Sequence, residues 1–198
     1  MFRVYCCKTY IAGALLTGAL VVQEAQPVHA DSAKTSIQPM VDTGTGSVIP
    51  GTGSILVRTK DAVGMTLHSF GLVPGNVYTA WFGIFNNPRA CATDPCTGDD
   101  LANPHVRGVV LNATGQIAGK DGTADFGGFK AVGDPTGREE SLGTAMALEK
   151  PLKAAIYLVV RSHGPALDGA DLQAQLTMFN GGCPPNNCED VQIAFHLP

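Results

Sequence analysis

Short runs of alternating apolar and polar residues, separated by Gly, Pro, Asn and Asp, make up most of the chain after residue 54. Such runs predict β-strands, because successive side chains of a strand point to opposite faces. The expected strands cover residues 55–59, 65–70, 77–85, 106–114, 123–131, 154–162, 172–179 and 191–197. Many short strands without intervening helices favour an all-β fold, and we expect an antiparallel immunoglobulin-like β-sandwich of about eight strands.

Two of these runs indicate which faces are buried. Residues 77–85 are apolar on both alternating faces, as is typical of a strand that is covered on both sides. Trp81, the only tryptophan, lies in this run, and core packing is its expected role. In the last run, residues 191–197, apolar and polar residues alternate, so we expect the apolar row to point inward and His196 to be exposed.

Helical periodicity is not sustained anywhere in the chain. Residues 142–152 are the best candidate for one or two helical turns, and Pro151 limits their length. Between two of the expected strands, Asp121-Gly122 favours a hairpin turn, because this pair supplies the positive φ angles that such turns require.

The first 30 residues have the features of a signal peptide. Arg3 and Lys8 precede an uncharged apolar run at residues 11–22, and the small residues Val28 and Ala30 suit cleavage after Ala30. The apolar run is shorter than the roughly 20 residues that cross a bilayer. We therefore expect a secreted or periplasmic protein with no membrane span in the mature chain.

The mature chain divides into two parts by composition. Residues 31–53 are rich in Gly, Ser and Thr, and we expect this segment to be flexible, with an edge strand at residues 47–49 as the alternative. The β-sandwich domain is expected to cover residues 54–198. This length is ordinary for one domain and sufficient for a buried core.

Charge excludes one class of partner. Removing Arg3, Lys8 and Glu24 from the 13 basic and 17 acidic residues leaves 11 and 16, a formal charge of −5, and no run of Lys or Arg. Because phosphate backbones bind cationic surfaces, we expect no nucleic-acid partner.

Cysteine spacing predicts disulfides. Four cysteines follow residue 30, in the two identically spaced pairs Cys91 with Cys96 and Cys183 with Cys188. Thiols are oxidised in exported proteins, so an even number at repeated spacing favours disulfides. Of three possible pairings we favour the two local ones, because proline and polar residues inside each loop promote a turn. A four-cysteine zinc site is the alternative, and the exporting context disfavours it.

Several stretches of the chain carry family-like motifs. They are Gly71-Leu-Val-Pro-Gly75-Asn-Val-Tyr78-Thr-Ala-Trp81, Phe85-Asn-Asn-Pro88, Leu158-Val-Val-Arg161-Ser-His163-Gly-Pro165, Gly182-Cys183 and Cys188-Glu-Asp190-Val-Gln192. Together they resemble a family of uncharacterised exported bacterial β-sandwich proteins. The resemblance covers roughly residues 55–198 and implies the exported sandwich, but it implies no activity.

The turn from Gly71 to Gly75 is also similar to one in copper-zinc superoxide dismutase, where the following strand carries metal-binding histidines. In this chain the following strand offers Tyr78 and Trp81 and no histidine. The copper ligands are therefore missing at the matching place. A hairpin that uses the same turn accounts for the similarity, and we expect no dismutase activity.

A hydrolase triad is disfavoured by spacing. Ser162, His163 and Asp168 supply the residue types of such a triad. However, Ser162 and His163 are adjacent on an expected strand, so their side chains diverge, and no Gly-x-Ser-x-Gly elbow is present. The expected alternative is a polar turn in which Arg161 or His163 hydrogen-bonds loop carbonyls.

Loops on a rigid scaffold often carry recognition. The candidate binding residues are Asn86, Asn87, Arg161, Ser162 and His163, which we expect to lie along one rim of the sandwich. No catalytic residue is assigned.

Metal and cofactor sites are not expected. Asp94, Asp99, Asp100, Glu189 and Asp190 could offer oxygen ligands to calcium, but no Asp-x-Asp-x-Asp-Gly loop is present, so solvated acidic loops are the ordinary explanation.

The histidines point the same way. His68, His105, His163 and His196 lie in four separate segments, and structural hydrogen bonding is the expected role of each. A metal site would need the fold to bring several of them together.

The leading functional prediction is a non-catalytic binding or interaction module with an unknown protein or glycan partner. It depends on a large strand scaffold without a convincing catalytic set. The alternative is a metal-dependent or hydrolytic extracytoplasmic enzyme, which would need at least three His, Asp or Glu side chains to converge in one cleft.

Overall fold

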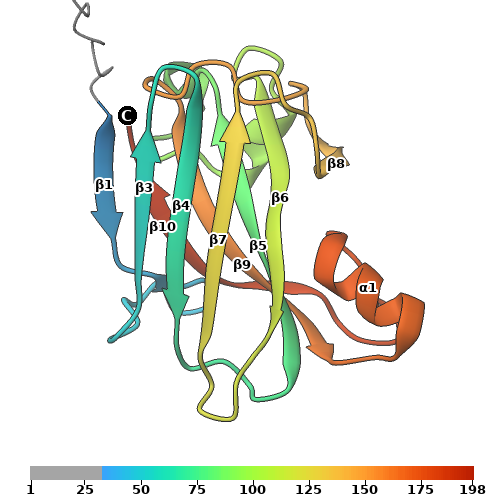
Figure 1. Cartoon of the computed structure of the whole chain (residues 1–198). Helices are drawn as coiled ribbons and strands as arrows, with labels where there is room; N and C mark the ends of the chain where they lie inside the picture. Colours follow the sequence, from blue (N-terminus) through green and yellow to red (C-terminus); the bar gives the residue numbers. More distant parts are fainter. Residues whose placement is uncertain (1–32) are drawn as a thin grey trace, which may run out of the picture. The chain divides into compact units, whose positions relative to one another are not determined.

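The computed structural model describes residues 33–198, which form two antiparallel β-sheets with ten strands (Figure 1). The four-stranded sheet has the order β1 (Lys34–Gln38), β3 (Gly53–Arg58), β4 (Ala62–Ser69), β7 (Ala124–Ala131). The six-stranded sheet has the order β2 (Val41–Asp42), β10 (Glu189–His196), β9 (Ala155–Pro165), β5 (Asn76–Phe85), β6 (Gly108–Ile117), β8 (Arg138–Gly143). The predicted all-β sandwich is confirmed, and the predicted signal peptide, residues 1–30, lies outside the described residues.

Three short helical elements lie outside the sheets. They are α1 (Gly169–Thr177) and the 3₁₀ turns η1 (Pro88–Ala90) and η2 (Gly98–Ala102). None of the helices within residues 33–198 has the length and apolar character needed to cross a bilayer. The immunoglobulin-like character of the sandwich stays a prediction.

The main core lies between the two sheets. From β5 it receives Tyr78, Phe82 and Ile84, and from the facing sheet it receives residues such as Leu56 and Met65. These side chains alternate along their strands with residues of the outer faces, as strand geometry requires. Every residue from Val77 to Phe85 is buried, so the prediction that this strand is covered on both faces is confirmed.

The segment expected to be flexible contains strands. Lys34–Gln38 pairs with β3 over five residues, and Val41–Asp42 pairs with β10. Met40, between these strands, is fully buried in the main core. The sandwich therefore begins at Lys34 and not at residue 54. The edge strand expected at residues 47–49 is reduced to one bridge, between Val48 and Val41.

Two expectations about secondary structure are wrong. We expect a strand at residues 172–179, but most of these residues belong to α1. The segment is rich in Leu, Ala and Gln, which are good helix formers. Residues 142–152 are not helical: β8 ends at Gly143, and a turn follows in which Lys153 and Ala154 both donate to the carbonyl of Lys150.

The last strand is inverted relative to its expected orientation. Gln192, Ala194 and His196 face the main core, while Ile193 and Phe195 pack on the outer face. A β-bulge between Asp190 and Gln192 shifts the pairing with β9. Because a shift of one residue moves every following side chain to the opposite face, His196 is buried and not exposed.

The buried polar groups of this inner row are hydrogen-bonded. His196 lies between the hydroxyls of Ser36 and Ser54, at 2.7 and 2.9 Å. Arg58 donates to the backbone carbonyls of Pro151, Ala154 and His196, each at 2.7 Å. Burial, with a smaller contribution from the Arg58 charge, lowers the pKa of His196 to about 4, so this histidine is neutral at physiological pH.

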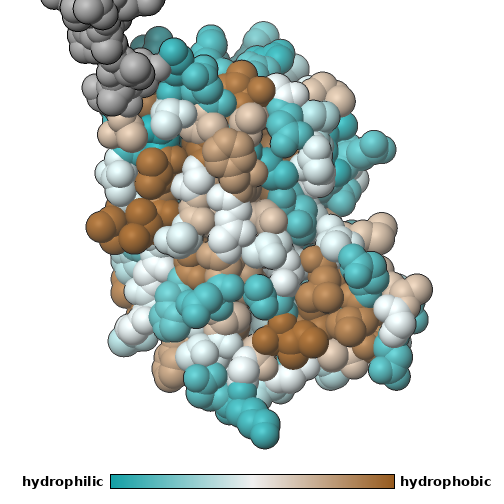
Figure 2. Space-filling model, in the orientation of Figure 1, coloured by the Kyte–Doolittle hydropathy of each residue, from teal (hydrophilic) through white to brown (hydrophobic). Residues whose placement is uncertain are grey.

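The outer faces of the two sheets differ. Figure 2 shows the outer face of the four-stranded sheet, where hydrophobic side chains over β1 and β3 reach solvent between polar ones. Ile37 is 70% exposed there, whereas Trp81, on the outer face of the six-stranded sheet, is 2% exposed. The outer face of the six-stranded sheet is covered by loops and by α1, and the candidate functional site lies there.

Candidate functional site

A second hydrophobic cluster lies on the outer face of the six-stranded sheet. Three aromatic rings from neighbouring strands form its centre: Tyr157 packs against Phe85 at 4.9 Å and against Phe195 at 4.8 Å between ring centroids. Val106, Cys96 and Ala155 complete its buried part. Such aromatic pairs stabilise beyond the area that they bury.

The first loop covers one end of this face and is closed by the Cys91–Cys96 disulfide. Asp100 holds the loop from within, because its carboxylate accepts hydrogen bonds from the backbone amides of Ala92 and Thr97, both at 2.8 Å. These amides lower the pKa of Asp100. Below the loop, the Tyr157 hydroxyl donates to the carbonyl of Cys96 at 3.1 Å.

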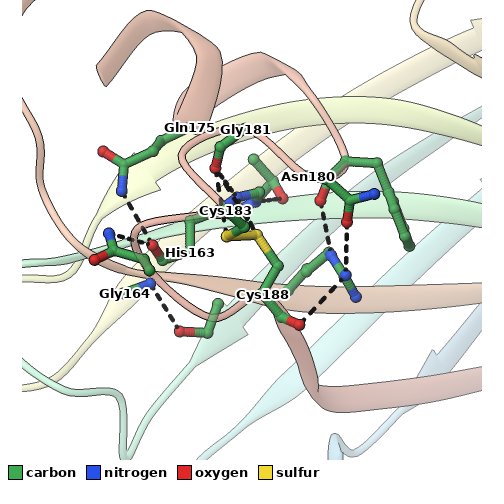
Figure 3. Close-up of a disulfide and its surroundings, with 12 residues drawn as sticks. His163, Gly164, Gln175, Asn180, Gly181, Cys183 and Cys188 are labelled. Atoms are coloured by element: carbon green, nitrogen blue, oxygen red, sulfur yellow. Dashed lines mark hydrogen bonds between the residues drawn. A yellow bond between two sulfur atoms is a disulfide. The ribbon is translucent and has the colours of Figure 1, made fainter. Parts of the chain in front are cut away.

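The second loop covers the other end and is closed by the Cys183–Cys188 disulfide, which lies over His163 (Figure 3). Trp81 Nε1 donates to the Thr79 hydroxyl at 2.6 Å, so the hydroxyl proton is available to His163 Nε2 at 2.7 Å. His163 Nδ1 then donates to the carbonyl of Gly181 at 2.9 Å. This network fixes a neutral imidazole.

Burial supports the same protonation state of His163. The residue is fully buried, and this burial lowers the pKa of His163 despite the opposing hydrogen bond to Gly181. Two amides complete the network. The side chains of Gln175, from α1, and Asn186, from the second loop, both donate to the carbonyls of His163 and Pro165. Figure 3 shows the Gln175 amide beside the His163 carbonyl.

Arg161 ties the second loop to the sheet. Its guanidinium lies 3.9 Å from the ring centroid of Phe179 and donates to that residue's carbonyl at 2.8 Å. It also donates to Asp190 Oδ1 at 2.6 Å and to Asn180 Oδ1 at 3.1 Å. Phe179 in turn packs edge-on against Trp81, at 5.1 Å between centroids. Arg161 therefore orients an aromatic wall on the sheet.

A groove of about 190 Å³ lies on this face, and residues that flank the two loops, such as Leu101 and Asp190, line it. We call it the outer groove. Its lining includes Trp81, Gly83, Tyr157, Val159, Phe179 and Ile193. Among the residues that line it within 33–198, Asp190 is the only charged one, and Arg161 pairs with it. Gly83 keeps the floor open, since a Cβ there would meet only Tyr157, at an ordinary 3.8 Å.

The structure separates the predicted binding residues. Phe85 pairs with Ala155, whereas Thr79 pairs with Arg161, so Asn86 lies at the far end of β9 from Arg161. Six residues of strand separate these positions, or about 20 Å. The expected single rim is therefore not formed.

The local roles of these residues also differ. Asn86 is buried, donates to the carbonyls of Arg107 and Ala147, and accepts from the Glu149 amide, so it is structural. Asn87 is exposed and donates to the carbonyl of His105. Ser162, between Arg161 and His163, is buried on the opposite face of its strand.

The described residues form no catalytic triad or open metal cage at this face. Both nitrogens of His163 are engaged by Thr79 and Gly181, and Ser162 points away from it. Within residues 33–198, the only groups of three His, Cys, Asp or Glu side chains with ligand atoms within 4.8 Å are His163 with Cys183 and Cys188, and Asp100 with Cys91 and Cys96. Each contains a disulfide, whose sulfurs are not thiolate ligands.

The other histidines lie apart from this site. His68 pairs with Asp125 at 2.6 Å on the outer face of the four-stranded sheet, and His105 is exposed on the loop before β6. His196 faces the main core. The convergence that a metal-dependent or hydrolytic enzyme would require is not seen among residues 33–198.

The residues that line the outer groove were not predicted as a site. Tyr157, Val159 and Ile193 come from alternate positions of β9 and β10, and Phe179 follows α1. One sequence feature could have indicated this site. The strand from Val77 to Phe85 is apolar on both faces, so other parts of the chain must cover its outer face as well.

Comparison of the chain with protein-family models, with curated proteins and with solved structures found no match.

Proposed function

We propose that this protein is an exported, non-catalytic binding module that holds one apolar side chain of a protein partner in the outer groove. The observation that carries the proposal is an apolar groove with aromatic walls, on a sheet face that two disulfide-closed loops flank. The resemblance to uncharacterised exported bacterial sandwich proteins is consistent with this role and stays a prediction.

The size of the groove supports a side chain as the occupant. Sites for drug-sized molecules and cofactors usually measure roughly 300–1,000 Å³, whereas the outer groove measures about 190 Å³. A volume of this order suits one aromatic or branched aliphatic side chain. Protein interfaces commonly depend on such an anchor in a dry pocket.

The rigidity of the walls also supports binding. Both loops are crosslinked, and Arg161 fixes Phe179 through one backbone hydrogen bond and one ring contact. A groove that is already ordered loses little conformational entropy when it is occupied. Local disulfides further support export, because they persist in oxidising compartments.

The test uses toluene, the side-chain analogue of phenylalanine, as the probe. Trp81 is the only tryptophan and lines the groove, so its fluorescence reports on this site alone. We expect saturable quenching or a spectral shift with a Kd on the order of 1 mM, which corresponds to a binding free energy of about 4 kcal/mol.

A matched pair of variants identifies the site. Gly83→Val fills the floor of the groove, and we expect it to weaken toluene binding at least ~10-fold. Gly64→Val is the control, since Gly64 lies on the outer face of the four-stranded sheet and its Cβ would also make only an ordinary contact, at 3.9 Å. Equal binding by wild type and folded Gly83→Val would reject the outer groove as the site.

A further inference from the structure

A strongly charged hollow lies at the other end of the sandwich, away from the His163 network. It measures about 790 Å³ and is lined by five exposed cations, Lys34, Arg89, Arg107, Lys150 and Lys153. We call it the basic hollow. Asn86 and Asn87, which the sequence marked as binding candidates, also line it.

The concentration of positive charge is high for this chain. The sequence has 13 lysines and arginines, of which Arg3 and Lys8 precede the described residues, so five of the remaining eleven line one hollow. Glu149 is the one acidic side chain that lines the hollow among the described residues. Acidic residues outnumber basic ones over the whole chain. Positive charge is therefore concentrated in this hollow, although the chain as a whole is acidic. A concave surface lined by charges of one sign concentrates counter-ions.

That acidic side chain is already engaged. Glu149 accepts from Arg107 Nε at 2.8 and 2.9 Å and also from Arg107 Nη2. Each of these two residues offsets the charge of the other, which leaves Lys34, Arg89, Lys150 and Lys153 as the excess charge of the hollow. Arg107 has a φ of 57°, a conformation that is uncommon for a residue other than glycine.

The framework of the hollow is fixed from below. Lys150 and Lys153 lie on one tight turn, closed by a 2.9 Å bond between the Lys153 amide and the Lys150 carbonyl. Arg58 donates to the carbonyls of Pro151 and Ala154 under this turn. Arg58 is 3% exposed, and its hydrogen bonds within residues 33–198 all go to backbone carbonyls, so its charge adds to the positive potential of this end.

We propose that the basic hollow binds a compact anion that carries two or more phosphate or carboxylate groups. Its volume lies in the range of small-molecule sites, and its five cationic side chains line one concavity. Lysine ammonium groups act as mobile point charges that adapt to phosphate or carboxylate oxygens. This site is separate from the outer groove and does not depend on the function proposed for it.

The test is calorimetric titration of the protein, residues 31–198, with pyrophosphate and with citrate at low ionic strength. We expect one site for at least one probe, and at least ~10-fold weaker binding when salt rises from 0.02 to 0.2 M, since several charges are screened. Lys150→Gln with Lys153→Gln should weaken binding at least ~10-fold. The control Lys120→Gln, in the exposed turn before β7, should change it less than ~2-fold.

A third variant predicts the opposite sign. Glu149→Gln removes the acidic side chain of the hollow and should strengthen binding several-fold, which loss of folding could not imitate. No heat with either probe at millimolar concentration would overturn the proposal, as would equal weakening by Lys120→Gln.

Two further arms distinguish other sources of the same charge. Binding to phosphatidylglycerol vesicles or to heparin, without binding of pyrophosphate or citrate, would replace the compact anion by a membrane surface or a polymer and would also overturn the proposal. Unchanged toluene binding by the lysine variants would show that the outer groove is intact.

Discussion

The two disulfide loops have the same spacing and cover the same face of the same sheet, yet the chemistry below them differs. The Cys91–Cys96 loop lies on an aromatic cluster whose polar contact is the Tyr157 hydroxyl on the Cys96 carbonyl. The Cys183–Cys188 loop lies on a hydrogen-bonded network centred on His163. Two disulfide loops of equal length can therefore cover either an apolar cluster or a hydrogen-bonded network. The strand residues on which each loop packs decide which of the two it covers.

Removing each disulfide in turn should distinguish the two loops, and it should give the largest change in the free energy of unfolding. In the chain-entropy view, equal loop lengths give equal losses of about 2 kcal/mol. Cys183→Ala with Cys188→Ala should lose about 1–3 kcal/mol more, because the Asn186 amide would lose its two hydrogen bonds, to the carbonyls of His163 and Pro165. Urea unfolding measures both free energies.

Cys91→Ala with Cys96→Ala is the matched control, with an expected loss of about 2–3 kcal/mol. Asp100 should keep part of that loop ordered, because its carboxylate accepts from the backbone amides of Ala92 and Thr97. If both double variants lost the same free energy of unfolding, or if the first loop's variant lost more, the proposed difference between the two loops would be contradicted.

The first loop should be sensitive to alkali. Burial raises the pKa of Tyr157 to about 12 against an ordinary value of 10.0, with smaller contributions from Asp94 and Asp100. The raised value stabilises the fold below pH 10, and this contribution is lost as pH rises from 10 towards 12. We expect a loss of up to about 2 kcal/mol, allowing for solvent screening.

Chemical unfolding at pH 9, 10 and 11 checks the alkaline prediction. Tyr157→Phe, which has no ionisable hydroxyl, should lose less stability across this range than wild type. Identical pH profiles for the two proteins would assign the alkaline loss to other groups.

The second loop should be sensitive to acid, and this is the smallest of the expected effects. The pKa of buried His163 lies below its ordinary value of 6.5, so the unfolded chain takes up the proton first as pH falls. The stabilisation from His163 is complete above pH 6.5 and is lost as pH falls below it.

The free energy of unfolding between pH 7.5 and 5 tests this expectation. His163→Gln should have a shallower slope than wild type, while His196, whose pKa is also lowered, contributes to both profiles. A slope that His163→Gln leaves unchanged would remove His163 as the acid-sensitive group.

Some of this architecture follows from local sequence. The pairing of Cys91 with Cys96 and of Cys183 with Cys188 follows from two short turn-forming loops, and the structure confirms it. The apolar run from Val77 to Phe85 predicted a strand covered on both sides, which is the basis of the outer groove. Local pattern was sufficient here because the constraints themselves are local.

Other features depend on contacts between distant segments. The bulge before Gln192 reverses the faces of β10, and the register that it sets belongs to the pairing with β9. Helix α1 buries Gln175 rather than its leucines, because that amide satisfies the carbonyls at the end of β9. The cations of the basic hollow come from separated segments, so no run of Lys or Arg in the sequence predicts this cluster.

The most direct test of the outer groove is a crystal structure of residues 31–198 soaked with toluene. The account predicts one toluene ring between Trp81, Val159 and Ile193, with both disulfide loops in place and no such ring in Gly83→Val crystals. An outer groove that stays closed to toluene, or a ring bound only at another surface, would contradict it.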